Sequence, residues 1–152
     1  MVQNQLLVHL MRLLILIIPV LLFMSCKKES PLDEVPEITF IRMFPDTVRA
    51  NTDSIVVELS YADGDGDIGE NNAYVKNLFF TDQRNQLTYG FRVSKIAEEG
   101  TPAIKGTLKV VMPYINLIQS PGPETTSFSI KLVDRAGHSS NLITSSALVI
   151  TE

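Results

Sequence analysis

Side chains that could do chemistry concentrate in one stretch of the 152-residue chain, from Tyr61 to Asn72. This stretch reads Tyr-Ala-Asp-Gly-Asp-Gly-Asp-Ile-Gly-Glu-Asn-Asn, so Asp63, Asp65 and Asp67 alternate with glycines. Glycine lets the backbone take positive φ and turn tightly, which brings the carboxylates together. Two such charges ~4 Å apart repel by about 4 kcal/mol near a protein surface. The stretch therefore needs either water around separated side chains or a cation among them.

Calcium suits this composition because it binds about 6–8 oxygen ligands from carboxylates, amides and backbone carbonyls. We predict a calcium-stabilised loop, and the alternative is a solvated acidic turn. Ile68 is expected to anchor the loop in the core, whereas Arg135 could neutralise the carboxylates by ion pairing and so compete with a metal. The candidate ligands all carry a side-chain oxygen and are Asp63, Asp65, Asp67, Glu70, Asn71 and Asp134.

Two familiar loop motifs do not fit this stretch. Gly64–Gly69 spells G-x-G-x-x-G, the dinucleotide-binding motif, after a predicted strand. That motif must open a helix whose N-terminus meets a pyrophosphate, but here another predicted strand follows. The two aspartates within it would also repel phosphate. An EF-hand counted from Asp63 would need glycine at position 6 and glutamate at position 12. The chain has Ile68 and Tyr74 there, so neither motif is predicted.

Short segments with alternating apolar residues follow one another from Ile38 onward. In the segment 55–61, Ile55, Val57 and Leu59 share one face, which is the period of two of a half-buried strand. Strands are predicted at residues 38–43, 55–61, 74–81, 87–93, 104–112, 128–132 and 142–150. Their even spacing, with no convincing helical period, indicates an all-β fold, a single seven-stranded β-sandwich over residues 37–152.

The segment Leu132–Asn141, which reads Leu-Val-Asp-Arg-Ala-Gly-His-Ser-Ser-Asn, looks like the last hairpin of many immunoglobulin-like modules. The whole strand pattern resembles immunoglobulin-like and fibronectin type III domains of bacterial surface proteins, without the cysteine pair and core tryptophan of antibody domains. If consecutive strands run up and down, the loops at residues 63–72, 98–102 and 134–140 share one end. Asp134 joins the candidate ligands for that reason.

An apolar run of 12 residues, Leu13–Met24, precedes Ser25 and Cys26. A membrane-spanning helix needs about 20 such residues, whereas a run of roughly 7–15 after a basic residue, here Arg12, is a signal-peptide core. The stretch resembles a bacterial lipoprotein signal of the loose Bacteroidetes type, with Phe23 where the usual motif has leucine. This resemblance implies a signal peptide over residues 1–25 and lipidation of Cys26. An uncleaved anchor helix is the alternative.

Residues 26–36 are charged, contain two prolines and show no periodicity, so they are predicted to be a tether. Lys27 and Lys28, followed by an acidic residue, look like the surface-export tag of Bacteroidetes-type lipoproteins. The resemblance implies an outer-membrane lipoprotein of the cell envelope, on its periplasmic or its surface side. Its first partner would be the membrane, through lipidated Cys26.

Composition narrows the function further. From Cys26 onward the chain has 12 basic and 17 acidic residues, a net charge of −5, and no basic stripe, so nucleic-acid binding is excluded. Neither G-x-S-x-G nor H-E-x-x-H occurs, and His138 is the single histidine after the leader. We predict a non-enzymatic binding module for an envelope protein or glycan. The alternatives are a carbohydrate-binding accessory lipoprotein of a glycan uptake system and a small hydrolase.

Overall fold

The structure is a computed structural model that describes residues 32–98, 100–119 and 121–152. The predicted signal peptide, Cys26 and the first residues of the tether lie outside this part of the chain. Ten strands and no helix occur in the described residues, so this part contains no helix that could cross a membrane. The strands are β1 (Glu37–Phe44), β2 (Thr47–Arg49), β3 (Ile55–Asp63), β4 (Leu78–Asp82), β5 (Thr88–Phe91), β6 (Ile104–Met112), β7 (Glu124–Thr126), β8 (Phe128–Leu132), β9 (Ile143–Thr144) and β10 (Leu148–Thr151).

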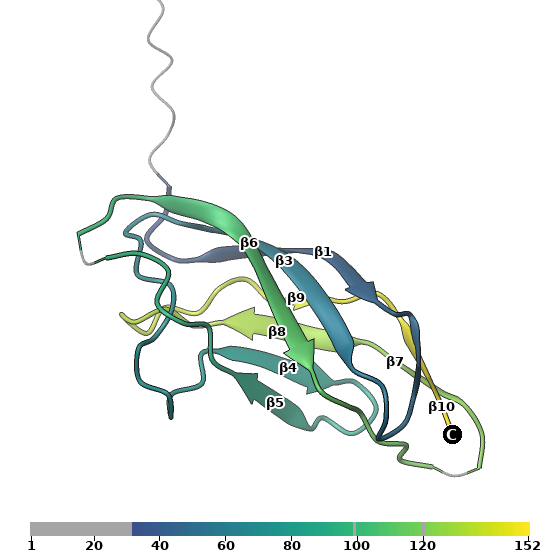
Figure 1. Ribbon diagram of the computed structural model, residues 1–152. Coiled ribbons are helices and arrows are strands. Elements are labelled where there is room, and N and C mark those ends of the chain that lie inside the picture. The colour runs from purple at the N-terminus through teal and green to yellow at the C-terminus, as the bar shows by residue number, and fades with distance from the viewer. Residues whose placement is uncertain (1–31, 99, 120) are drawn as a thin grey trace, which may run out of the picture. The chain divides into compact units, whose positions relative to one another are not determined.

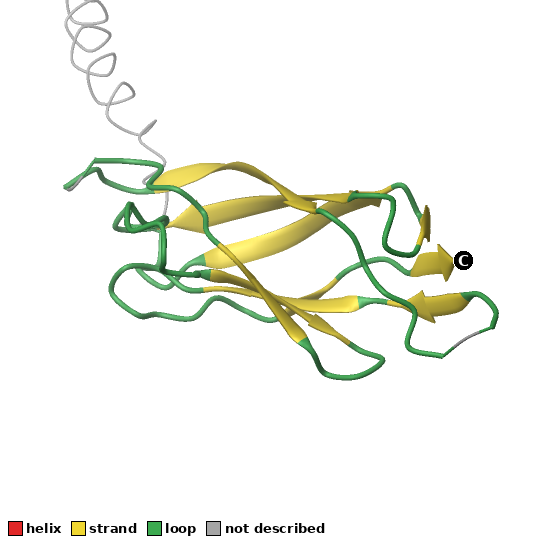
Figure 2. Ribbon diagram, turned by 60° about the horizontal axis from the view of Figure 1, so that its bottom comes forward, coloured by secondary structure: helices red, strands yellow, loops and turns green. Residues whose placement is uncertain are grey.

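The fold is all-β, and two larger sheets face each other in it (Figures 1 and 2). One sheet has the strand order β1-β3-β6 and the other has the order β5-β4-β8-β9, and all their pairs are antiparallel. A small third sheet, β2-β10-β7, includes a parallel pair between β2 and β10. This arrangement is consistent with a β-sandwich.

One hydrophobic core draws side chains from all three sheets. On β3, Ile55, Val57 and Leu59 are at most 1% exposed, which confirms the alternation seen in the sequence. Phe80 of β4 and Phe128 of β8 are also fully buried, and their ring centroids lie 6.1 Å apart in an edge-on contact. Full burial of such a side chain stabilises a fold by about 1.5–3 kcal/mol, so this core is the main stabilising feature.

The ten strands differ from the seven that the sequence predicts. The additional strands, β2 and β7, have three residues each, which is too short to display a period of two, and the last predicted strand is divided into β9 and β10. The third predicted strand starts at Leu78 and not at Tyr74. Asn77 explains that start, because its buried side-chain amide both donates to and accepts from the backbone of Val93 and so holds the chain before the strand.

An ionic row crosses the outer face of the first larger sheet. Arg42, Glu58 and Lys109 lie opposite one another on β1, β3 and β6. Arg42 Nε is 2.7 Å and Lys109 Nζ 3.1 Å from the Glu58 carboxylate. Hydrogen bonds from Arg42 and then from Lys109 lower the pKa of Glu58 to about 2. The row supports the register of these strands.

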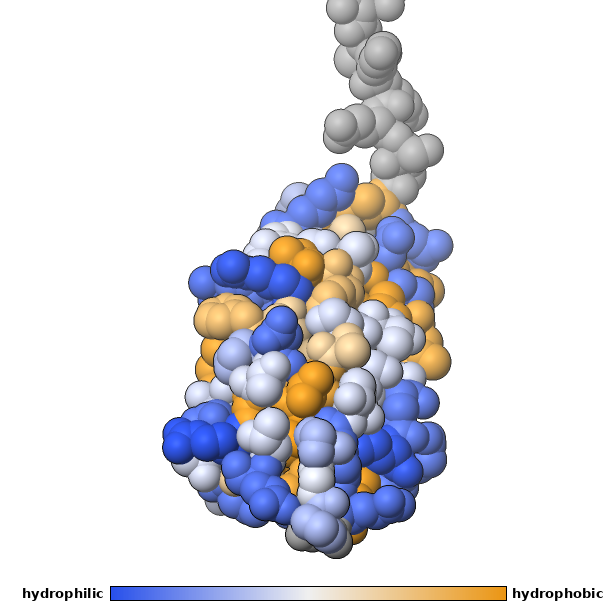
Figure 3. Space-filling view, turned by 90° about the vertical axis from the view of Figure 1, so that its right-hand side faces the viewer, coloured by the Kyte–Doolittle hydropathy of each residue, from blue (hydrophilic) through white to orange (hydrophobic). Residues whose placement is uncertain are grey.

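The register places the start of the domain beside the acidic stretch. Glu37, the first residue of β1, pairs with Ala62, and Asp63, the last residue of β3, pairs with Ile104 of β6. We call this the tether end; it comprises residues 32–36, 64–77, 100–103 and 134–138. The far end carries the turn between β4 and β5 and the described residues 113–119 and 121–127. Figure 3, which faces the C-terminal side, shows hydrophobic residues scattered among hydrophilic ones there.

Candidate metal centre

The end of β3 gathers three aspartates. Asp63 closes the strand, Asp65 and Asp67 follow it, and one carboxylate oxygen from each lies within 4.8 Å of the other two. Gly66, between them, has φ of +71°, and a Cβ at this position would lie 2.6 Å from the carbonyl oxygen of Thr101. Only glycine fits there, so the chain can fold the carboxylates together as the sequence predicts.

Burial leaves two of these carboxylates without enough partners. Asp63 is 0% exposed; its Oδ2 accepts a hydrogen bond of 2.8 Å from the Asp67 N–H, and its Oδ1 accepts none from the described residues. Asp67 Oδ1 is likewise buried without a partner. A buried acceptor without a donor costs about 1–3 kcal/mol, and more when it is charged. Both unsatisfied oxygens belong to residues of one acidic cluster, and a cation bound there would satisfy them.

The same environment disfavours ionisation of these groups. Burial, opposed by the Asp67 N–H bond and reinforced by the charges of Asp65, Asp67 and Asp134, raises the pKa of Asp63 to about 6. Burial and then the charge of Asp134 also raise the pKa of Asp67. Without a cation, the ionised cluster therefore destabilises the fold at neutral pH. A bound cation would remove this penalty and favour the charged forms.

Asp134, in the turn after β8, brings a fourth carboxylate near the triad. Asp134 is 7% exposed, and its charge contributes to the raised pKa of both Asp63 and Asp67. Its own oxygens are already engaged: the His138 N–H donates to Oδ1 at 2.8 Å, and His138 Nδ1 lies 3.0 Å from Oδ2. Asp134 therefore borders the triad, as the up-and-down topology predicts, while its carboxylate shapes its own turn.

The turn after β8 also holds the acidic loop directly. The Ala136 N–H donates to Asp67 Oδ2 at 2.8 Å, and the Arg135 guanidinium donates to the carbonyl oxygen of Gly69 at 3.1 Å. Among the described residues Arg135 forms no ion pair with the triad. Burial and then the charge of Asp134 raise the pKa of Asp67 further than the charge of Arg135 lowers it, so Arg135 offsets part of the negative charge of the cluster. Ile68 is 0% exposed, as expected of the residue that anchors the loop in the core.

Glu70 and Asn71 lie beyond the triad. Glu70 Oε1 accepts a hydrogen bond of 2.9 Å from the Asn72 N–H, and the Glu70 N–H donates to the carbonyl oxygen of Val93. Asn71 is exposed. The structure thus brings together three of the six predicted ligands, places Asp134 beside them, and uses Glu70 to shape the next turn.

The donor set fits a hard cation. Asp63, Asp65 and Asp67 offer only oxygen atoms, and carboxylate oxygens are the ligands that calcium prefers. Asp63 would contribute from inside the protein, whereas Asp65 is exposed and leaves the outer side open. The remaining ligands of a calcium ion would come from backbone carbonyls, water or an anion on that outer side.

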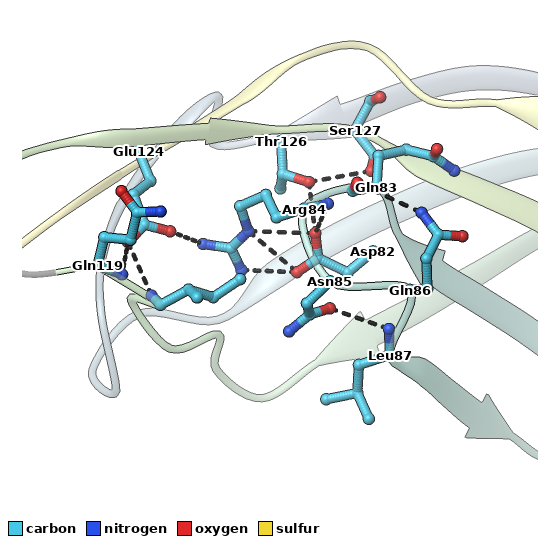
Figure 4. Close-up of polar contacts among 11 residues, drawn as sticks. Asp82, Gln83, Arg84, Asn85, Gln86, Leu87, Gln119, Glu124, Thr126 and Ser127 are labelled. Atoms are coloured by element: carbon cyan, nitrogen blue, oxygen red, sulfur yellow. Dashed lines mark hydrogen bonds and ion pairs between the residues drawn. The ribbon is translucent and has the colours of Figure 1, made fainter.

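A second charged cluster, which the sequence does not reveal, lies at the far end (Figure 4). The Arg84 guanidinium contacts Asp82 at 2.6 Å and Glu124 at 2.5 Å, and Thr126 Oγ1 donates to Asp82 at 2.6 Å. Asp82 is 0% exposed and all its oxygens have partners, so this cluster is a structural link between β4 and β7. Glu124 comes 40 residues after Arg84, and Thr126 comes 44 residues after Asp82. No local sequence pattern therefore predicts these contacts.

No protein-family model matches this sequence, and no curated protein matches it. Function is therefore inferred from the residues and their geometry alone.

Proposed function

We propose that this chain is a lipid-anchored protein of the cell envelope, an outer-membrane lipoprotein whose β-domain is a non-enzymatic binding module with a calcium-stabilised acidic loop. The observation that carries the metal part is the fully buried Asp63, whose Oδ1 has no partner and whose carboxylate clusters with those of Asp65 and Asp67. A fold that keeps such a carboxylate at neutral pH gains stability when a divalent cation binds it.

We also propose that the domain is of the immunoglobulin-like type. Such sandwiches place strands A, B and E in one sheet and strands C, F and G in the other, with C′ added beside C in the variable type. If β1, β3 and β6 are A, B and E, and β5, β4, β8 and β9 are C′, C, F and G, both observed strand orders fit this scheme. The short β2, β7 and β10 then extend the sandwich at the far end.

The geometry of the triad supports a non-enzymatic role. Glycoside hydrolysis needs two carboxyl groups about 5–5.5 Å or more apart, on either side of a reachable bond. Here one oxygen of each carboxylate lies within 4.8 Å of the other two, and Asp63 is 0% exposed and so out of reach of a sugar substrate. A substrate could not enter between them, whereas a single ion could.

The lipid anchor rests on the sequence before the described residues. Cys26 is the only cysteine of the chain and directly follows the apolar run and Ser25. With the leader removed, a Cys26→Ala variant should not partition into the detergent phase, while a processed Ser30→Ala variant, changed in the tether, should do so. Detergent partitioning of Cys26→Ala after removal of the leader would refute lipidation.

Calcium titration of the full chain in detergent, followed by calorimetry, tests the metal site. We expect binding to the wild type and its loss in Asp63→Asn, which removes the buried charge. Asp46→Asn is the matched control, since Asp46 is exposed and lies between β1 and β2 at the far end. No heat and no rise in melting temperature at millimolar calcium would end the proposal of a metal site.

A further inference from the structure

The segment that leads to the anchor packs on the acidic loop. Gly64, between the first two aspartates, faces the backbone of Leu32 and Asp33, and a Cβ on Gly64 would overlap both their carbonyl oxygens. The chain therefore leaves the domain beside the metal loop. Since Leu32 already lies on the domain, only six residues, from Lys27 to Leu32, lead from the cysteine to the domain, and these span at most about 20 Å when fully extended. A lipid on Cys26 would therefore hold the tether end within this length of chain from the membrane.

The same end carries an exposed tip with the composition of a membrane interface. Tyr74 is 92% exposed and Val75 is 39% exposed. Asn72 builds this turn, because its Oδ1 accepts a hydrogen bond of 3.0 Å from the Tyr74 N–H and its carbonyl oxygen accepts one from the Val75 N–H. Lys76, also exposed, follows. Tyrosine favours the boundary between lipid and water, and lysine is attracted by anionic headgroups.

The charge of the tether end depends on the metal. The carboxylates of Asp63, Asp65 and Asp67 together carry three negative charges when ionised, which would repel an anionic membrane. A calcium ion reduces this charge to −1 and leaves coordination positions open on the side of exposed Asp65. Phosphate oxygens of lipid headgroups are ligands of the kind that such an ion binds.

We propose, on the basis of the function proposed above, that the calcium-loaded tether end docks on anionic lipid headgroups of the membrane that holds Cys26. The ion in the triad contacts headgroup phosphates, and Tyr74, Val75 and Lys76 enter the headgroup region. The occupant of this surface is the bilayer, because the short tether keeps the surface close to it. Docking sets the orientation of the domain, so that the far end points away from the membrane.

The chain contains no tryptophan, so a single introduced tryptophan reports on one place only. Tyr74→Trp places the reporter at the proposed contact. Tyr114→Trp is the matched control, because Tyr114 is 53% exposed and follows β6 at the far end, where Met112 pairs with Ile55. Each full-length lipidated variant is reconstituted in vesicles of phosphatidylcholine alone or with phosphatidylglycerol, in calcium or in EDTA, and tryptophan emission and quenching by brominated lipid are measured.

We expect a blue shift and quenching of Tyr74→Trp only with calcium and phosphatidylglycerol together, and neither change for Tyr114→Trp. A Tyr74→Trp signal that is unchanged by calcium, while calcium still raises the melting temperature, would overturn the docking and leave the metal site standing. Equal quenching of both reporters would also overturn it. If calcium neither binds nor stabilises the chain, the proposed metal site fails and the docking fails with it.

Discussion

Replacing Asp63 by asparagine should change the stability of the protein in opposite directions with and without calcium. In the metal-free protein, burial and neighbouring carboxylates raise the pKa of Asp63 from 3.8 to about 6. The folded state therefore binds this proton more tightly than the unfolded state does. An acid of this kind destabilises the fold as the pH rises through the interval from 3.8 to about 6, and the loss is complete above it.

The size of the effect follows from that interval. A difference of about 2 in pKa corresponds to roughly 3 kcal/mol in the free energy of unfolding at pH 8. Asparagine carries no charge and keeps an oxygen that can accept the Asp67 N–H bond that Asp63 accepts now. We therefore expect Asp63→Asn to be more stable than the wild type in EDTA at pH 8. For a domain of this size, the gain corresponds to a rise in melting temperature on the order of 10 °C.

Calcium reverses the order. A ligand at 1,000 times its dissociation constant stabilises the folded state by about 4.1 kcal/mol. This gain exceeds the advantage of roughly 3 kcal/mol that Asp63→Asn has in EDTA, and it is available to the wild type and lost in the variant. The assay is thermal unfolding of both proteins at pH 5 and pH 8, each in EDTA and in millimolar calcium, with Asp46→Asn as the control. A lower melting temperature of Asp63→Asn in EDTA, or an undiminished response to calcium, would refute the reasoning.

Three further outcomes can be measured. Gly66→Ala should lower the free energy of unfolding by about 1–3 kcal/mol and weaken calcium binding, since its Cβ would lie 2.6 Å from a facing carbonyl oxygen. Gly100→Ala is the control, because Gly100 also has a positive φ, of +77°, but no atom lies within 4 Å of its Cβ position. Calorimetry should show that Gly100→Ala keeps calcium binding. Arg84→Met leaves the fully buried Asp82 unpaired and should cost about 3–5 kcal/mol in urea unfolding; a change under 1 kcal/mol would contradict the structural role of the pair. The carboxylate of Glu58 should titrate near pH 2 when followed by NMR. Its stabilising contribution is therefore present above its ordinary pKa of 4.5 and is lost as the pH falls towards 2. Titration near pH 4.5 would contradict the ionic row.

The features that the sequence predicts are local ones. The alternation in β3 and the glycines between the aspartates are each contained in fewer than ten residues, and the structure confirms both the buried face of β3 and the gathering of Asp63, Asp65 and Asp67. Periodicity and turn chemistry act over such short distances. A strand of three residues shows no period, which is why β2 and β7 are absent from the prediction.

Contacts between distant segments could not be predicted in this way. Arg84 joins Asp82 to Glu124, 40 residues later, and nothing near Arg84 in the sequence selects that partner. The packing of Leu32 against Gly64 depends equally on the register between β1 and β3. For the acidic loop, the sequence supplies the ligand types, and the burial of Asp63 depends on its place at the end of β3, where it pairs with Ile104 of β6 directly after the last β1 pair, Glu37 with Ala62.

The triad lies where a force on the tether would enter the domain. If Cys26 is lipidated, any pull on the domain enters through the tether and meets the packing of Leu32 and Asp33 on Gly64, and then the strand pair at Glu37 and Ala62. Asp63 is the next residue of β3, and the turn after β8, in the opposite sheet, bonds Asp67. A cation shared by Asp63 and Asp67 would therefore hold the end of β3 to the loop that the turn after β8 bonds, close to where the pull arrives. The ion that removes the cost of the buried charge would also strengthen the end of the domain that carries the anchor.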